Sequence, residues 1–370
     1  MKNLPASLVA RLNQGEMPFV EFMQQALYAA DFGYYSKGLA KFGAAGDFVT
    51  APEISPLFAQ TLALQCEEIL IEIPNAQLFE FGAGSGRLCV DLLRQLEKMN
   101  RLPCCYRILE VSGDLRQRQQ ALVQQEIPHL AACIEWLDNW PETSFNGIIV
   151  ANEVLDAMPI HRFLRQNDSF YESMVLFNEQ GDLVEQFKPC QNVRLLDYLT
   201  KELPSLESPY LSEVNLFIEG WIKQCADMLE TGVIFLIDYG FPRHEYYHPD
   251  RKQGTLMCHY HHQAHTNPLV YVGEQDITAH VDFTHVAEAA DAAGLMVSGY
   301  TSQAAFLLAN GLLSLLENIT DERELFKARQ AIKQLTHPSE MGELFKVMAL
   351  SKNLDRDFQG FQLHDKRATL

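Results

Sequence analysis

The sequence feature that most limits the possible folds of this chain is a predicted strand that runs into a glycine-rich turn. Residues 77–81 are mainly apolar, and Gly82, Gly84 and Gly86 follow at alternate positions. Glycines let the backbone turn tightly and approach a ligand closely, because they carry no Cβ. Leucines then recur at helical spacing over residues 88–96, which predicts a helix with one buried face. Free N–H groups at the start of that helix would point at a ligand, so the segment predicts a cofactor-binding turn.

The residues around the glycines help to separate two cofactor classes. Dinucleotide sites usually have a third glycine at the position that Arg87 occupies here. Glu80 stands two residues before the first glycine, where a carboxylate would repel a diphosphate but attract the ammonium of S-adenosylmethionine. The motif resembles the acidic-x-Gly-x-Gly-x-Gly signature of class I methyltransferases, with Glu80 near the methionine end of the cofactor. The glycine turn alone leaves a dinucleotide site or a plain tight turn open.

Two further predicted strands supply candidate cofactor ligands at their carboxyl ends. Residues 104–111 form a strand that ends near Glu110, whose carboxylate can accept two hydrogen bonds from ribose hydroxyls. A short strand over 134–138 would bring two residues to the adenine. There Leu137 would pack on the ring and Asp138 would accept a hydrogen bond from the exocyclic amine.

Two continuous apolar runs, 147–152 and 232–240, are typical of central strands in a sheet covered by helices on both faces. Ligands bind at the carboxyl ends of such strands. The polar residues that end these runs, among them Asn152 and Asp238, should therefore face one crevice. The pattern predicts an α/β fold with a Rossmann-like sheet.

Four longer blocks of sequence resemble the signatures of a single family, the MidA family. These blocks are 32–35, 46–55, 152–159 and 273–283. The family includes the mitochondrial complex I assembly methyltransferase that symmetrically dimethylates an arginine of a complex I subunit. The resemblance extends from about residue 19 to residue 350. It implies a class I methyltransferase sheet, mostly parallel with an antiparallel last strand, S-adenosyl-L-methionine as cofactor, and a protein arginine as acceptor.

Methyl transfer from a sulfonium requires an aligned acceptor rather than a metal. An arginine acceptor starts as a protonated guanidinium, so carboxylates must hold it and receive its proton. The candidate catalytic residues are Asn152, Glu153 and Asp156, and Asn152 is also a candidate cofactor ligand. In a helical turn, Glu153 and Asp156 would face the same way and act like the paired glutamates of arginine methyltransferases. The alternative is a capped turn in which Asp156 accepts bonds from backbone N–H groups.

The chain is expected to divide into two parts. Residues 1–75 form a mostly helical N-terminal region, in which a glycine-rich loop over 38–46 would be a lid on the cofactor. Residues 76–370 form the methyltransferase domain. Insertions into that domain are expected at about 160–210 and 250–283.

Each insertion carries its own predictions. The first should hold an antiparallel ribbon, and a helix over 212–229 should lead back to the sheet. In the second, the histidine-rich segment 258–265 lacks a Cys-x-x-Cys pair or a His-Glu-x-x-His spacing, which favours a loop over the acceptor and no metal site. His280 either relays a proton or is a structural histidine.

Composition and charge limit which partners the protein is expected to bind and in which cellular compartment it is expected to work. The net charge of −19 argues against nucleic acid and would attract a basic peptide, although general solubility explains the same charge. No apolar run could span a bilayer, no signal-peptide core is present, and eight cysteines show no secreted-domain spacing, so a cytoplasmic location is expected. The expected partner is a protein with an exposed arginine, with a respiratory-complex subunit as a candidate, and a homodimer is an option. A small-molecule acceptor and a non-catalytic, cofactor-binding assembly factor stay open as alternatives.

Overall fold

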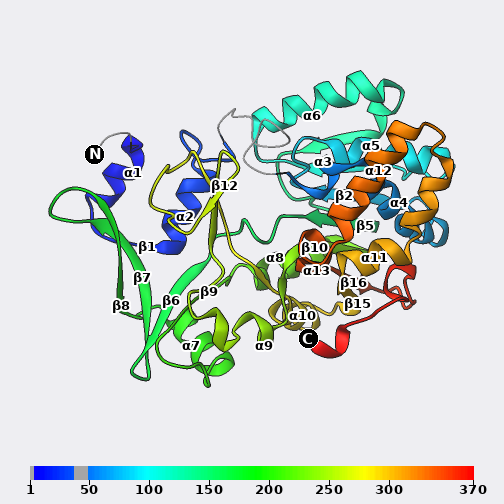
Figure 1. Cartoon of the computed structure of the whole chain (residues 1–370). Helices are drawn as coiled ribbons and strands as arrows, with labels where there is room; N and C mark the ends of the chain where they lie inside the picture. The colour runs from blue at the N-terminus through cyan, green and yellow to red at the C-terminus, as the bar shows by residue number, and fades with distance from the viewer. Residues whose placement is uncertain (1–3, 37–48) are drawn as a thin grey trace.

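A large sheet at the centre of the molecule organises the fold, and the computed structural model describes the chain over residues 4–36 and 49–370. Within those residues, seven strands follow the order β15-β16-β10-β5-β2-β3-β4, and a further short strand, β14, pairs with β10 (Figure 1). They are β2 (Gln77–Phe81), β3 (Tyr106–Leu109), β4 (Ile134–Leu137), β5 (Phe145–Asn152), β10 (Leu229–Phe241), β14 (Val281–Asp282), β15 (Met296–Ser302) and β16 (Phe345–Lys352).

Strand direction in this sheet confirms the predicted fold class. The neighbours from β4 to β10 pair in parallel, whereas β16 runs antiparallel to both β10 and β15. The register places Phe81 opposite both Leu109 and Ala151, and Asn152 opposite Ile237. The carboxyl ends of β2, β3, β5 and β10 therefore meet along one edge of the sheet, as ligand binding in such folds requires.

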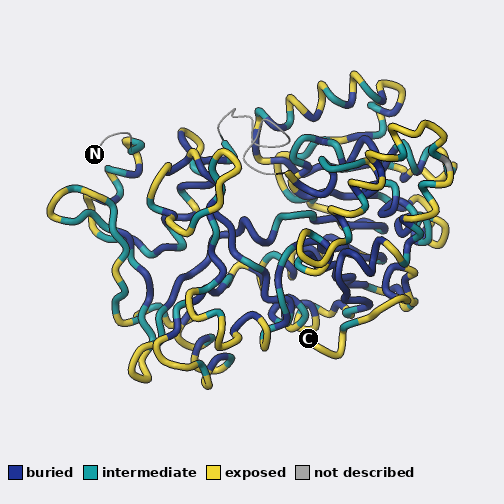
Figure 2. Tube along the Cα trace, viewed as in Figure 1, coloured by how far each residue is buried: buried dark blue, intermediate teal, exposed yellow. Residues whose placement is uncertain are grey.

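Helices cover both faces of the large sheet, because successive strand residues point to opposite faces. Leu78 packs on one face and Phe79 on the other. The first face contacts α4 (Pro56–Glu72), α5 (Arg87–Lys98), α6 (Gly113–Glu126), α11 (Gln303–Ala309) and α12 (Glu322–Thr336). The second face contacts α8 (Ile218–Met228) and α10 (Phe283–Ala292). Figure 2 shows the buried strands between these layers.

A smaller sheet lies beside the large one and is built mainly from the first insertion. Its order is β1-β7-β6-β9, with β8 beside β7. The strands are β1 (Met17–Pro18), β6 (His161–Gln166), β7 (Ser169–Phe177), β8 (Leu183–Pro189) and β9 (Tyr210–Val214), and the helices near them are α1 (Ala6–Leu12), α2 (Phe19–Tyr28) and α7 (Val193–Glu202). The predicted antiparallel ribbon is confirmed by β6, β7 and β8.

The helix predicted over 212–229 is wrong at its start. Residues Ser212–Val214 belong to β9, where Ser212 pairs with Phe163 of β6, and the helix α8 begins only at Ile218. The Asn215 side chain accepts a hydrogen bond from the Phe217 N–H, which turns the chain between the strand and the helix. The pairing with a strand about 50 residues earlier overrides the local helical pattern.

The second insertion forms a third sheet of three short strands, in the order β12-β11-β13. These strands are β11 (Met257–Tyr260), β12 (Gln263–His265) and β13 (Asp276–Thr278). The remaining short helices are α3 (Ala51–Ile54), α9 (Arg243–Tyr246), α13 (Met341–Leu344), η1 (Pro128–Cys133), η2 (Pro249–Arg251), η3 (Leu312–Asn318), η4 (Gln359–Phe361) and η5 (Arg367–Thr369).

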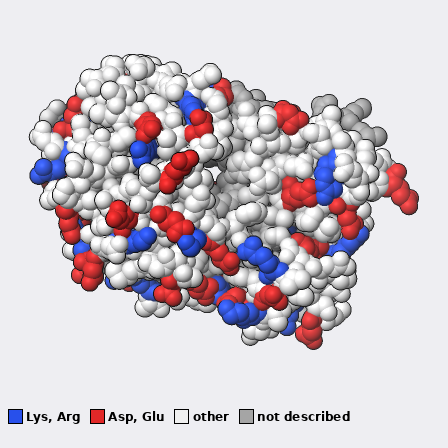
Figure 3. Space-filling view, turned by 180° about the vertical axis from the view of Figure 1, so that it is seen from behind, with Lys and Arg blue, Asp and Glu red and all other residues white. Residues whose placement is uncertain are grey.

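The described parts of the N-terminal region pack in two places. Helix α2 buries Phe19, Phe22 and Met23 in a cluster with the small sheet, whereas α4 buries its apolar side against the large sheet. The predicted lid loop over 38–46 lies outside the described residues. No helix in the described part of the chain is long and apolar enough to cross a membrane. Acidic and basic side chains are interspersed on the face shown in Figure 3.

Candidate cofactor and acceptor site

The glycine turn between β2 and α5 has the geometry that its sequence predicts. Gly82, Gly84 and Gly86 all have positive φ, of 57°, 53° and 86°. Gly82 and Gly84 line a cavity, whereas Gly86 does not. A Cβ on Gly86 would lie 3.3 Å from the Cα of Gln119, so Gly86 allows α5 and α6 to pack closely.

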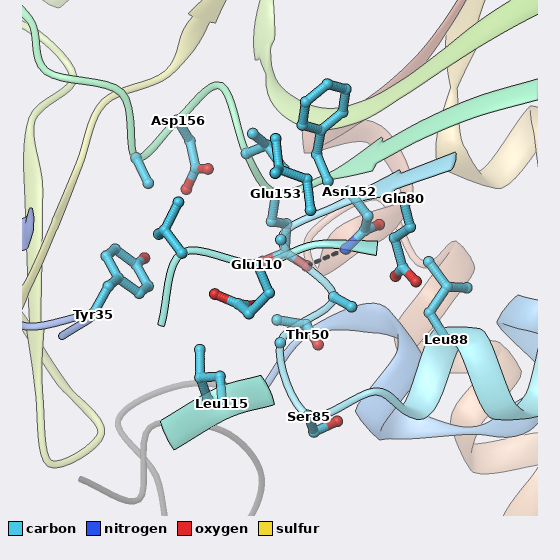
Figure 4. A pocket seen from close by; sticks show the side chains of 18 of the residues that line it. Tyr35, Thr50, Glu80, Ser85, Leu88, Glu110, Leu115, Asn152, Glu153 and Asp156 are labelled. Atoms are coloured by element: carbon cyan, nitrogen blue, oxygen red, sulfur yellow. Dashed lines mark hydrogen bonds between the residues drawn. The ribbon is translucent and has the colours of Figure 1, made fainter. Parts of the chain in front are cut away.

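The cavity has a volume of about 310 Å³ and lies where the carboxyl ends of β2, β3 and β5 meet. Most of the predicted site residues line it, namely Glu80, Gly82, Gly84, Glu110, Asn152, Glu153 and Asp156. Figure 4 shows Asp156 and Tyr35 toward one end of the cavity and Glu80 and Leu88 toward the other, with Asn152 and Glu153 between them. The structure thus brings together predicted site residues from three separate segments, which lie at or just after the carboxyl ends of β2, β3 and β5.

The cavity is acidic. Six carboxyl side chains line it, whereas none of its described lining residues is a lysine, an arginine or a histidine. The carboxyl residues are Glu53, Glu80, Glu110, Glu153, Asp156 and Asp276. Carboxylates gathered without a cation favour a cationic ligand. S-adenosylmethionine, with its ammonium and sulfonium, fits this requirement.

Glu80 lies toward the same end of the cavity as Leu88 and is 2% exposed. Its Oε2 accepts a hydrogen bond of 2.6 Å from the Tyr106 hydroxyl. Burial raises the pKa of Glu80 to about 7, which the Tyr106 hydrogen bond opposes and the Glu110 charge reinforces. A bound ammonium would supply the positive charge that this carboxylate lacks. The role at the methionine end of the cofactor stays a prediction.

Glu110 follows β3 and is held by two donors. Its Oε1 accepts a hydrogen bond of 2.9 Å from the Ser112 N–H, and its Oε2 accepts one of 3.0 Å from Gln119 Nε2. Gln119 also donates to the Gly84 carbonyl at 2.9 Å, and its own oxygen accepts a bond of 3.0 Å from Trp136. The buried Gln119 side chain therefore ties the glycine turn to Glu110. Sequence reasoning missed this residue, because a glutamine within a polar helix gives no signal of burial.

Leu137 and Asp138, predicted to contact the adenine, are not among the described residues that line the cavity. The Asp138 side chain is 78% exposed and forms an ion pair of 2.8 Å with Arg116, which also donates to the Leu137 carbonyl at 2.7 Å. Trp140 lines the cavity instead, with its ring centroid 4.9 Å from that of Phe81. The chain after β4 thus continues for two residues past Asp138 before an aromatic side chain turns inward.

Asn152 and Glu153 stand at the end of β5. The Asn152 Nδ2 donates to Glu153 Oε1 at 3.3 Å, the bond that is dashed in Figure 4. Removal from water raises the pKa of Glu153 to about 8, and the Asp156 charge adds to this effect while the Asn152 bond opposes it. The buried Asn152 Oδ1 and Asp156 Oδ1 have no hydrogen-bond partner among the described residues. Acceptor atoms left open in this way fit a site that receives a donor-rich cation.

The predicted helical turn over Glu153 and Asp156 is wrong. Residues 153–158 form a non-helical turn, in which Glu153 has a φ of 53°. One oxygen of Asp238 accepts hydrogen bonds from the N–H groups of Val154, Leu155 and Asp156, at 3.0–3.3 Å. The backbone donors of this turn therefore bind a carboxylate of the neighbouring strand β10. Both carboxyl groups still line the cavity, as predicted.

Asp156 has a partner of its own from β10. The Tyr239 hydroxyl donates to Asp156 Oδ2 at 2.5 Å. Burial raises the pKa of Asp156 to about 6, and the Tyr239 bond opposes this rise.

Two tyrosines and an aspartate line the end of the cavity near Asp156, where an acceptor is expected. The rings of Tyr28 and Tyr35 stack with centroids 5.5 Å apart, and the Tyr35 hydroxyl donates to Asp276 Oδ1 at 3.0 Å. Tyr28 donates to the Ala157 carbonyl at 2.9 Å. Helix α2, the segment after it and strand β13 each contribute one residue to this part of the cavity lining, namely Tyr28, Tyr35 and Asp276.

The histidines of the second insertion lie elsewhere. His280 does not line the cavity, and its ring packs between Tyr239 and Phe241 with centroid distances of 5.1 and 5.3 Å. Burial, reinforced by the charges of Arg251 and Lys346, lowers the pKa of His280 to about 4, which favours the structural interpretation over a proton relay. Among the described residues, no group of three or more His, Cys, Asp or Glu side chains is placed to hold a metal.

Comparisons with known proteins agree with this geometry. A family model of S-adenosyl-L-methionine-dependent methyltransferases, Methyltransf_28, matches residues 61–301. A solved structure from Burkholderia thailandensis with S-adenosyl-homocysteine bound is 42% identical, with a TM-score of 0.94, and the match covers 99% of this chain and 96% of that one.

Curated relatives carry a more specific name. A mitochondrial protein arginine methyltransferase NDUFAF7 homolog of Caenorhabditis elegans is 26% identical over 91% of this chain and 83% of the relative. The mouse protein arginine methyltransferase NDUFAF7 is 27% identical over 91% and 81%. With the glycine turn, the acidic cavity and these matches together, the chain belongs to the MidA family of S-adenosyl-L-methionine-dependent methyltransferases.

Proposed function

We propose that this enzyme transfers the methyl group of S-adenosyl-L-methionine to a guanidinium nitrogen of an arginine side chain on a partner protein. The observation that carries the proposal is the acceptor end of the cavity. Glu153, Asp156 and Asp276 line it, and no cationic side chain lies among the described lining residues. A guanidinium is a planar cation with five N–H donors, which matches several carboxylates better than a neutral acceptor does.

The residues have separate roles in this mechanism. The cofactor supplies an activated methyl group on a sulfonium. Glu80 would hold the ammonium and Glu110 the ribose hydroxyls. Glu153 and Asp156 would hold the guanidinium and bring one nitrogen into line with the methyl group, at a contact of about 3–3.5 Å.

The reaction also requires a proton acceptor. When the N–CH₃ bond forms and the S–CH₃ bond breaks, the guanidinium must lose one proton. Glu153 has a raised pKa in the free enzyme, so its ionised form is a stronger base than an ordinary glutamate. A bound cation favours that ionised form. Glu153 is therefore the proposed base, and Asp156, held by Tyr239, is the second arm of the clamp.

The names of the curated relatives support a protein arginine as acceptor. A respiratory-complex subunit as the partner, a homodimer and a cytoplasmic location stay predictions from the sequence. All eight cysteines are free, which fits a reducing compartment.

Radiolabel transfer tests the proposal without knowledge of the partner. The purified enzyme is incubated with tritiated S-adenosylmethionine and an extract of cells that lack its gene, and the protein hydrolysate is separated by chromatography. We expect label in methylarginine with wild type, a loss of at least about tenfold with Glu153→Gln, and no loss with the exposed control Glu179→Gln. Label in small molecules would favour the small-molecule acceptor, and no label anywhere would favour the assembly factor.

A further inference from the structure

The turn that carries the candidate acceptor carboxylates has a strained backbone. Glu153 has a φ of 53°, a left-handed conformation that is uncommon for a residue with a Cβ. Such a conformation persists only where the surrounding structure holds it, and it occurs often at active sites. The question is which contacts hold Glu153.

Asp238, near the carboxyl end of β10, contacts this turn through its carboxylate. Its Oδ2 accepts hydrogen bonds from three consecutive N–H groups, those of Val154 at 3.2 Å, Leu155 at 3.0 Å and Asp156 at 3.3 Å. Its Oδ1 accepts a bond of 2.9 Å from the Tyr239 N–H. Both oxygens of this carboxylate, which is 1% exposed, are therefore occupied by backbone donors.

The residues on either side of Asp238 bind the same turn. The Ile237 carbonyl accepts a bond of 2.9 Å from the Glu153 N–H, and the Tyr239 hydroxyl donates to the Asp156 carboxylate. Strand β10 lies between β5 and β16 in the large sheet, so it provides a rigid support. Three consecutive residues of one central strand thus bind residues 153–156 of this turn.

We propose that Asp238 is a positioning residue for methyl transfer. It holds the N–H groups of residues 154–156 so that Glu153 keeps its left-handed conformation and presents its carboxylate to the acceptor. Asp238 is not among the described residues that line the cavity, so it acts through Glu153 rather than on a ligand. The catalytic part of this inference rests on the proposed function, whereas the positioning part does not.

The variant Asp238→Asn preserves size but replaces one acceptor oxygen with an N–H₂ donor. It can satisfy either the three N–H groups of the turn or the Tyr239 N–H, but not both. Asp282→Asn is a matched control. Asp282 is also buried, and its Oδ1 accepts N–H bonds from Thr284 and His285 of α10, at 3.0 and 3.1 Å, rather than from the turn. It is not among the described residues that line the site cavity.

Hydrogen exchange followed by mass spectrometry tests the positioning directly. We expect Asp238→Asn to speed amide exchange in peptides that span residues 153–158, while calorimetry gives an affinity for S-adenosylhomocysteine within about twofold of wild type. Asp282→Asn should leave exchange in those peptides unchanged. Unchanged exchange in Asp238→Asn, or a loss of cofactor affinity as large as the loss of rate, would overturn the inference.

A double-mutant cycle tests the catalytic consequence, with the rate of methylarginine formation at saturating cofactor as the readout. Asp238→Asn alone should lower this rate at least about tenfold, because small displacements of a positioned group are costly. In a Glu153→Gln background, the same change should cost less than about threefold. Additive losses would show that Asp238 does not act through Glu153. If Glu153→Gln alone keeps the full rate, the proposed function fails, and hydrogen exchange still decides whether Asp238 holds the turn.

Discussion

Replacing Glu153 with glutamine should stabilise the free enzyme at alkaline pH while it removes the proposed base. The folded protein raises the pKa of this carboxyl from 4.5 to about 8, so it favours the protonated form. The protonated Glu153 carboxyl makes its full contribution to the free energy of unfolding below pH 4.5. This contribution is lost as the pH rises toward 8, because the unfolded chain releases the proton at a lower pH than the folded protein does. At 1.36 kcal/mol per pH unit, the cost above pH 8 is at most about 5 kcal/mol.

About 3 kcal/mol of this cost falls between pH 6 and pH 9, since the penalty is already partly present at pH 6. Glutamine has the same shape and does not ionise, so Glu153→Gln avoids the penalty. With an unfolding entropy of about 2.1 cal/mol/K per residue, 3 kcal/mol corresponds to a Tm difference of about 2–4 °C for a chain of this length.

The assay is thermal unfolding of wild type, Glu153→Gln and the exposed control Glu179→Gln at pH 6 and pH 9. The Tm of Glu153→Gln minus that of wild type should increase by about 2–4 °C between the two pH values, whereas the control should follow wild type. Cationic S-adenosylmethionine should shrink the difference at pH 9 more than S-adenosylhomocysteine does. A difference that is the same at both pH values would show that the cavity does not perturb Glu153, and the electrostatic reasoning about the acceptor end would be refuted.

Three further predictions concern the cofactor end. Glu110→Ala should weaken S-adenosylhomocysteine binding at least about tenfold by calorimetry, because it removes the proposed ribose acceptor, and unchanged affinity would contradict this placement. Asp138→Ala should change the same affinity by less than about twofold, because the Asp138 side chain is exposed and is not among the described residues that line the cavity. A larger loss of affinity would support the predicted contact between Asp138 and the adenine. Tyr106→Phe removes the bond that opposes the raised pKa of Glu80, so S-adenosylmethionine affinity should fall at pH 6 and recover toward pH 9; a loss independent of pH would mean that Tyr106 acts only through packing.

The position of Glu80, Gly82, Gly84 and Glu110 at one cavity could be predicted from sequence because their signals are local. A glycine turn after a strand, with an acid two residues before it, fixes the identity and position of Gly82, Gly84 and Glu80 through backbone geometry alone. Glu110 follows from the same rule, since parallel strands end at a common edge. The direction of the strands was therefore enough to predict that these residues lie close together.

The rest depends on contacts between distant parts of the chain. The turn after β5 is non-helical because its N–H groups bind Asp238, 84 residues after Val154. Asp276 and Tyr35, separated by 241 residues, meet at the acceptor end. Ser212–Val214 becomes a strand because β6 offers it a partner. Periodicity along the sequence carries no information about such pairings, so it predicts the elements better than the contacts that shape the acceptor end.

The central claim is that Glu153 serves methyl transfer to a protein arginine. The most direct measurement is quantitative mass spectrometry of methylarginine peptides from the native host, from a strain that lacks the gene, and from that strain complemented with Glu153→Gln or with Glu179→Gln. We predict that at least one methylarginine site disappears on deletion, returns with Glu179→Gln and stays absent with Glu153→Gln. An unchanged set of methylarginine sites in the deletion strain, or full restoration by Glu153→Gln, would contradict the account.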